Sequence, residues 1–204
     1  MTRHTPRLAI AALLALAAGS AGAVQFPVTG SITVNGTAYA LPNGSFGDSV
    51  YDPLSGILGA GRFTFPQSSI QVPIDGVGMA TVTYQLSQAD PAGALVASDG
   101  VAAMEPVAMT LAILWIAVPV PIGTDPCHFT PIDLDLSGSG GPGGLELEDR
   151  AFTVPPTTDA CGGFASQINA ALAGNSNSIA LQLAGDFTPP AGDPDKIFVD
   201  GFDP

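Results

Sequence analysis

Apolar and polar residues alternate along much of this chain, and a period of two residues is the pattern of a half-buried β-strand. The clearest alternating runs are residues 26–34, 70–74 and 80–86. Asn35-Gly36 follows the first run and Asp75-Gly76 separates the other two, and both dipeptides are typical of tight hairpin turns. The order strand, turn, strand therefore predicts antiparallel sheets.

Glycine and proline leave little room for long helices, because the chain holds 25 and 19 of them among 204 residues. Hydrophobic residues make up 46%, which is too many for a disordered chain. Only residues 164–173 favour a helix, with Phe164, Ile168 and Leu172 on one face. We expect one all-β domain at residues 24–186, an antiparallel β-sandwich (Ig-like or jelly-roll-like) with one short helix.

The longest apolar run, residues 107–118, is apolar at both alternating sets of positions. A buried helix, a membrane span and a buried strand all fit such a run, but it is too short to span a bilayer as a helix. Its β-branched residues and the prolines after it favour a central strand covered on both sides. Trp115 is then expected in the core, and an exposed aromatic platform for a ligand is the alternative.

The first 23 residues have the three parts of an export signal. Arg3 and Arg7 lie in a basic start, residues 8–18 are apolar, and Ala21 and Ala23 fit the small-residue rule for cleavage after Ala23. The apolar part is too short for a membrane anchor. We expect a secreted or cell-envelope protein, in the periplasm or at the cell surface, with no stable membrane span after signal removal.

The charge balance excludes a nucleic-acid partner. Five Lys and Arg stand against 18 Asp and Glu, for a formal net charge of −13. Removal of the signal leaves three basic residues, and such a surface cannot neutralise a phosphate backbone or an anionic membrane.

Two cysteines, Cys127 and Cys161, are expected to form a disulfide in an oxidising compartment. The alternative is a nucleophilic thiol, since Cys161 precedes the predicted helix and His128 is the one histidine of the mature chain. No sequence pattern of a thiol protease surrounds either cysteine. With one histidine and paired cysteines, a zinc site is excluded.

The sequence Phe-Gly-Asp-Ser-Val at residues 46–50 resembles the nucleophile block of SGNH-type (GDSL) esterases, and Asp125 and His128 have that family's Asp-x-x-His spacing. The resemblance implies that Ser49 attacks, His128 accepts its proton and Asp125 orients the imidazole. However, a turn precedes Ser49 where the family has a hydrophobic strand, the Gly-x-Asn-Asp block is absent, and too little helix is predicted. We therefore expect a polar loop and no catalysis.

Acidic and apolar residues alternate in residues 132–136 and 145–148, on either side of a Gly-rich stretch. A hairpin with residues 137–144 as its loop would place Asp135 opposite Glu146 and Asp133 opposite Glu148. Four carboxylates on one face predict either a solvated acidic surface or a weak Ca²⁺ site. The sequence indicates no other cofactor.

Several segments together resemble uncharacterised secreted bacterial β-sandwich proteins with one disulfide. These are residues 53–56 (PLSG), GRFTFP at 61–66, the long apolar run, residues 125–138, AFTVP at 151–155, Cys161 with the short helix, and NSIALQLAG at 177–185. The resemblance implies a sandwich fold and assigns no activity.

Residues 187–204 are expected to form a Pro-rich linker and a C-terminal tail. Residues 195–202 (DKIFVDGF) resemble an Ile-Phe-x-Asp-Gly-Phe tail that recurs on exported Gram-negative proteins. The resemblance implies that Ile197, Phe198, Asp200, Gly201 and Phe202 are read by a sorting factor. The alternative is that this tip adds a strand to the domain.

Together these features predict an exported, non-catalytic protein with a binding, adhesive or envelope-structural role. Its partner would be an unknown protein or surface ligand. The alternative function is a secreted esterase that uses Ser49, Asp125 and His128.

Overall fold

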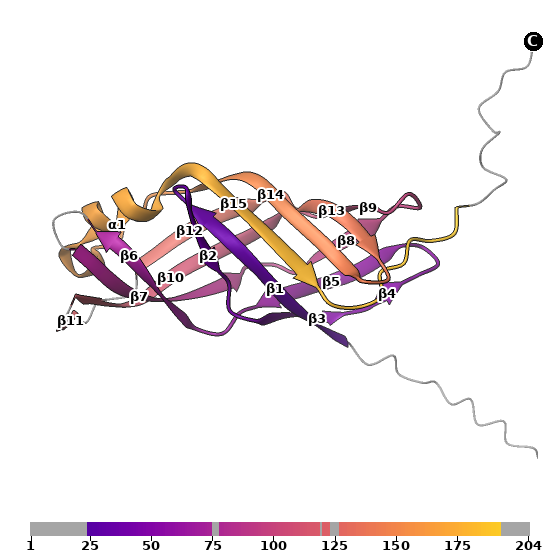
Figure 1. Ribbon diagram of the computed structural model, residues 1–204, viewed down its shortest axis with the longest axis horizontal. Coiled ribbons are helices and arrows are strands. Elements are labelled where there is room, and N and C mark those ends of the chain that lie inside the picture. Colours follow the sequence, from indigo (N-terminus) through magenta and orange to yellow (C-terminus); the bar gives the residue numbers. More distant parts are fainter. Residues whose placement is uncertain (1–23, 75–77, 119, 123–126, 193–204) are drawn as a thin grey trace, which may run out of the picture.

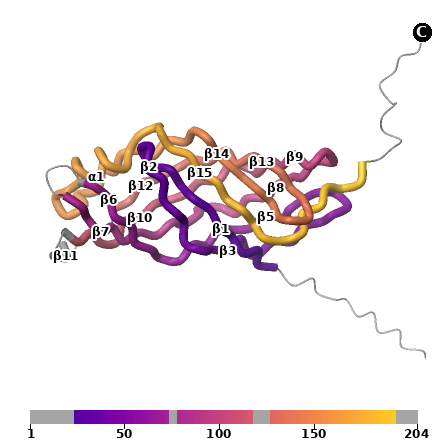
Figure 2. Tube along the Cα trace, viewed as in Figure 1, coloured from indigo at the N-terminus to yellow at the C-terminus, as the bar shows by residue number. Residues whose placement is uncertain are grey.

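The computed structural model describes residues 24–74, 78–118, 120–122 and 127–192 (Figure 1). Almost every element is a strand, all strand pairs are antiparallel, and the one α-helix in this part of the chain is short. Both ends of the described chain lie toward the end of the molecule opposite α1 (Figure 2). The prediction of an antiparallel all-β fold with one short helix is confirmed.

Eight strands close into an antiparallel barrel rather than a clear sandwich. In ring order they are β5 (Ile57–Thr64), β3 (Gly44–Ser49), β1 (Val24–Val34), β15 (Gly174–Leu183), β14 (Gly144–Val154), β13 (Ser137–Gly141), β9 (Val101–Met104) and β8 (Ala92–Val96). The ring closes where β8 pairs with β5, with Ala94 opposite Leu58 and Ala92 opposite Gly61. Gly61, Ala92 and Ala94 are small and buried, which suits the narrow interior of an eight-stranded barrel.

Further strands extend the sheet beyond the barrel. They are β2 (Thr37–Ala40) on β1, β4 (Tyr51–Asp52) on β5, and the set β6 (Ser68–Ile74), β7 (Gly78–Gln88), β10 (Val107–Val118), β11 (Val120–Ile122) and β12 (Cys127–Leu134). Strands β6, β7, β10 and β12 pair in that order, and we call them the outer layer. This layer joins β5 at one residue pair, Thr64 with Ser87.

Residues 35 and 36 form the two-residue turn between β1 and β2, where Val34 pairs with Thr37. Asn35 and Gly36 both have positive φ, as a twisted hairpin of this length requires. The predicted turn is confirmed here, whereas Asp75-Gly76 lies outside the described residues.

The apolar run at residues 107–118 is the central strand β10, as predicted, but it is not covered on both faces. It pairs with β7 on one side and β12 on the other, as a central strand should. Its faces differ, however: Ile113 and Ile116 are buried, whereas Trp115 is 45% exposed. The expectation that Trp115 lies in the core is wrong, because the register shifts between Ile113 and Trp115 and turns the indole to the outer face.

The helix α1 (Ala165–Leu172) follows a 3₁₀ turn at Cys161–Gly163 and lies within the predicted range. Its buried residues are Ile168 and Leu172. The predicted disulfide joins Cys127 to Cys161, with their Cα atoms 5.0 Å apart. It therefore ties the start of β12 to the turn from which α1 begins, and the nucleophilic-thiol alternative is wrong.

The packed domain continues beyond the expected boundary at residue 186. Phe187 is fully buried, with its ring centroid 5.0 Å from that of Phe26 and 5.2 Å from that of Tyr51. The Tyr51 hydroxyl donates to the Thr188 carbonyl oxygen at 2.8 Å. The first residues of the expected linker thus belong to the fold, because they cover the open side of Phe26.

A buried amide, Gln88, replaces ladder bonds where β5 and β7 separate. Its Oε1 accepts from the Phe63 N–H at 2.7 Å, and its Nε2 donates to the carbonyl oxygens of Gly61, at 3.4 Å, and Asp90. Every polar atom of this side chain therefore has a partner, as burial demands.

We predict that reduction of the disulfide lowers the free energy of unfolding by about 4 kcal/mol, because the bond closes a loop of about 35 residues. For a domain of this size the melting temperature should fall by about 10 °C. Thermal melts with and without reductant measure the change. Two titratable thiols in the unreduced, unfolded protein would contradict the assignment.

We also predict that Gln88→Leu destabilises the fold by about 1–3 kcal/mol, because it leaves the buried Phe63 N–H without an acceptor. Gln85→Leu is the matched control, since Gln85 is exposed on the same strand and its loss should cost less than about 0.5 kcal/mol. Denaturant unfolding of both variants compares them. Equal stability of the two variants would show that the Gln88 amide does not stabilise the place where β5 and β7 separate.

Candidate functional site

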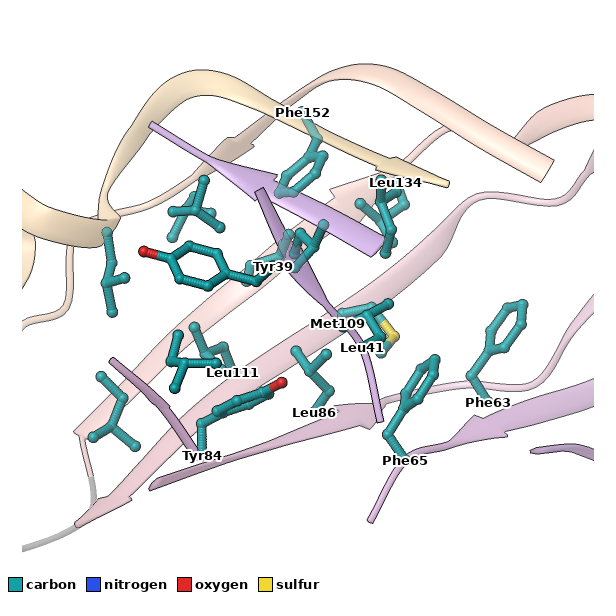
Figure 3. A pocket seen from close by; sticks show the side chains of 18 of the residues that line it. Tyr39, Leu41, Phe63, Phe65, Tyr84, Leu86, Met109, Leu111, Leu134 and Phe152 are labelled. Atoms are coloured by element: carbon teal, nitrogen blue, oxygen red, sulfur yellow. The ribbon is translucent and has the colours of Figure 1, made fainter. Parts of the chain in front are cut away.

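An apolar pocket of about 60 Å³ lies between the outer layer and the strands β1, β2, β14 and β15. Twenty side chains line it, and none of them is charged. Figure 3 shows Tyr39, Tyr84, Leu111 and Phe152 pointing into this space from four different strands. Leu172 brings α1 to the same pocket, so the disulfide anchors one of its walls.

The pocket reaches the surface between two strand edges. Of its lining residues, Ile32, Val34 and Tyr39 on the β1–β2 hairpin and Ile70 on β6 are only half-buried. Among the described pairings β2 joins β1 alone and β6 joins β7 alone, so no ladder connects these edges. Side chains, rather than backbone hydrogen bonds, therefore cover the space between the edges of β2 and β6.

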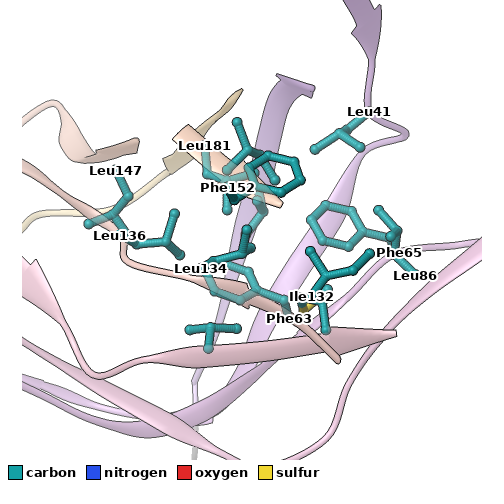
Figure 4. Packing of buried hydrophobic residues seen from close by; sticks show 14 of the residues in the cluster. Leu41, Phe63, Phe65, Leu86, Ile132, Leu134, Leu136, Leu147, Phe152 and Leu181 are labelled. Carbon is teal, nitrogen blue, oxygen red and sulfur yellow. The ribbon is translucent and has the colours of Figure 1, made fainter. Parts of the chain in front are cut away.

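The floor of the pocket is well packed. Phe63 and Phe65 stack with their ring centroids 6.3 Å apart, and Phe63 also lies 4.9 Å from Phe46. Figure 4 shows the same cluster continuing through Leu134 toward Leu136 and Leu147 of the barrel core.

The polar groups in the lining are the hydroxyls of Tyr39 and Tyr84. Burial raises the pKa of Tyr84, and its hydrogen bond with Ser68 partly offsets this shift. The Tyr84 phenol therefore remains neutral at physiological pH. Such a pocket accepts an uncharged apolar group, with a hydroxyl available for one hydrogen bond.

An empty apolar cavity lowers the free energy of unfolding, because the side chains around it lose packing contacts. At roughly 24 cal/mol per Å³, a cavity of about 60 Å³ reduces stability by about 1.4 kcal/mol. An occupant that restores these contacts would recover that energy.

The residues of the esterase hypothesis are not brought together in the described part of the chain. Ser49 is 2% exposed, and its hydroxyl donates to the Gly59 carbonyl oxygen at 2.5 Å. It lies on β3, and β5, β7 and β10 separate that strand from β12, which carries His128. Asp125 lies outside the described residues.

His128 has a different acidic partner from the one predicted. Asp159 accepts from the His128 backbone N–H at 2.7 Å and lies 3.0 Å from its Nδ1. The backbone N–H first, and the imidazole second, hold the pKa of Asp159 below its usual value. The contact therefore contributes stability above the ordinary carboxyl pKa and loses it as the pH falls through the lowered one.

The predicted register of the acidic hairpin is wrong. Ser137 pairs with Glu148 and Ser139 with Glu146, so the Gly-rich stretch is itself strand β13, and the loop is Pro142-Gly143. A Cβ at Gly138 would overlap the backbone oxygen of Glu146, and one at Gly140 would lie 2.8 Å from the Val96 side chain, so these two positions favour glycine. Sequence alternation cannot detect a strand that has few side chains.

The four carboxylates of the calcium hypothesis are consequently not opposed. Asp133 pairs with Ala108 on β10, and the Asp135 N–H donates to Asp149 at 2.9 Å. Glu148 forms an ion pair with Arg150. In the described residues no three His, Cys, Asp or Glu side chains are grouped as a metal site requires. Ca²⁺ binding stays a prediction without the register that motivated it.

The signal segment at residues 1–23 and the tail residues Ile197, Phe198, Asp200, Gly201 and Phe202 lie outside the described residues. Within the part that is described, no helix combines the length and apolar character needed to cross a membrane. Comparison of the chain with family models, curated proteins and solved structures gives no match.

The pocket itself was missed by the sequence reasoning. Its lining comes from nine strands and α1, with additional residues such as Leu41 and Phe65 between strands. The alternating pattern indicates that each of these strands buries one face, but not that two layers leave space between them. That property depends on contacts between segments far apart in the chain.

Proposed function

We propose that this chain is an exported, non-catalytic binding protein that holds a slim aliphatic group in the pocket between its outer layer and the β1–β2 hairpin. The observation that carries this proposal is an uncharged, apolar pocket that reaches the surface between the unpaired edges of β2 and β6. Export rests on the signal pattern of residues 1–23.

The size of the pocket favours one class of ligand. A cavity of about 150 Å³ admits benzene, whereas this one is about 60 Å³. Two or three methylene groups fit the available space, so the end of an acyl or alkyl chain suits it better than a ring. Each buried methylene contributes about 0.8 kcal/mol.

Two features support a binding role over the esterase alternative. The buried Ser49 hydroxyl donates to a backbone carbonyl oxygen, and three strands separate its strand from the one that carries His128. Neither Ser49 nor His128 lines the apolar pocket. An ester bound there would lie away from both groups.

A series of ethanol, 1-propanol, 1-butanol, 1-hexanol and 1-octanol tests the proposal by calorimetry and thermal shift. We expect the affinity to rise about fourfold per methylene until the pocket is filled, and then to level off. Saturating ligand, at about 100 times its Kd, should stabilise the protein by about 2.7 kcal/mol.

Leu111→Phe should lower the affinity tenfold or more without lowering the melting temperature, because the larger ring fills the pocket. Leu54→Phe is the matched control, since Leu54 is 89% exposed in the turn before β5. An equal response of both variants, or an affinity that rises without levelling off, would indicate surface partitioning and contradict the proposal.

A further inference from the structure

Three of the four strands of the outer layer, β6, β7 and β10, present an uncharged outward surface, whereas the fourth, β12, carries the exposed Asp133. Strands β6, β7 and β10 contain no Asp, Glu, Lys or Arg, although the whole chain has a net charge of −13. The outward side chains that define this surface, which we call the hydroxyl face, are Ser69, Gln71, Thr81, Thr83, Thr110 and Trp115. Each is exposed or half-buried.

The polar groups of the hydroxyl face are arranged across neighbouring strands. The hydroxyls of Ser69 and Thr83 lie 2.8 Å apart, and the Gln71 amide donates to the Thr81 hydroxyl at 2.6 Å. Thr110 donates to Thr130 on β12 at 3.0 Å. These bonds fix the side chains in place, so less conformational entropy is lost when they contact a partner.

Trp115 is the one tryptophan of the chain and lies within this polar array. It pairs with Thr83, which in turn pairs with Ser69, so an indole and two hydroxyls form one row across β10, β7 and β6. An exposed, flat aromatic ring beside fixed hydroxyls offers an apolar platform with hydrogen-bonding groups at its edge.

From this arrangement we propose that the hydroxyl face binds an uncharged polysaccharide. A pyranose ring has an apolar C–H face that stacks on an indole, and hydroxyls at its rim that bond to Ser, Thr and Gln side chains. The absence of charge on the three strands matches a neutral ligand. Insertion into lipid is disfavoured, because it would strip water from a surface dominated by hydroxyl and amide groups.

This site is independent of the pocket. On β7, Val82 and Tyr84 line the pocket, whereas Thr81 and Thr83 point to the opposite face of the same sheet. The two ligands would therefore bind on opposite sides of the layer, and loss of one site leaves the other intact.

The test uses the mature protein with cellulose, chitin and soluble dextran. Trp115 is its own reporter, so binding of a soluble chain should shift the intrinsic fluorescence, and pull-down measures binding to the insoluble polymers. We expect at least one polymer to bind, with an affinity that changes less than twofold between 50 and 500 mM NaCl, because no ion pair forms.

Trp115→Ala should weaken this binding tenfold or more, Thr83→Val should weaken it severalfold, and Trp115→Phe should restore part of the loss. Leu54→Ala is the control and should bind like the native chain, and unchanged 1-octanol binding by each variant verifies its fold. The proposal is overturned by binding to none of the three polymers, by equal losses in Leu54→Ala, or by binding to phosphatidylcholine vesicles instead.

Discussion

The architecture depends on the hydrogen bonds of Gln88, because the sheet divides beside this residue into the barrel and the outer layer. We call this place the branch. Strands β5 and β7 share one residue pair, and the Gln88 amide provides bonds to Phe63 and Gly61 beside it. From this branch β5 turns to β8 and closes the barrel, while β7 continues into the outer layer. A full ladder between β5 and β7 would hold the two together and leave no separate layer.

The separation of β5 and β7 gives the outer layer two faces of different chemistry. Because side chains alternate along β7, the inner face supplies Val82 and Tyr84 to an apolar pocket, and the outer face supplies Thr81 and Thr83 to a neutral polar surface. The disulfide and α1 brace the end where the barrel no longer supports the layer. The pocket lies between this layer and the barrel, whereas the hydroxyl face lies on the layer alone.

Local sequence signals predicted the local features of this fold. The hairpin at Asn35-Gly36, the helix around Ile168 and the disulfide all follow from short-range patterns and composition. Closure of β8 on β5, the Gly-rich strand β13 and the exposure of Trp115 depend instead on distant segments and on a register shift. The pocket belongs to this second group, because it is a property of how two layers diverge.

Methyl NMR of the methionines tests the central claim, that the space beside the branch is a ligand site. Met109 lines the pocket, Met104 is buried in the barrel on β9, and Met79 is exposed on β7. During titration with 1-octanol, the Met109 methyl signal should shift and saturate, while those of Met104 and Met79 stay in place. A Met109 signal that does not move, or three signals that move together, would contradict the account.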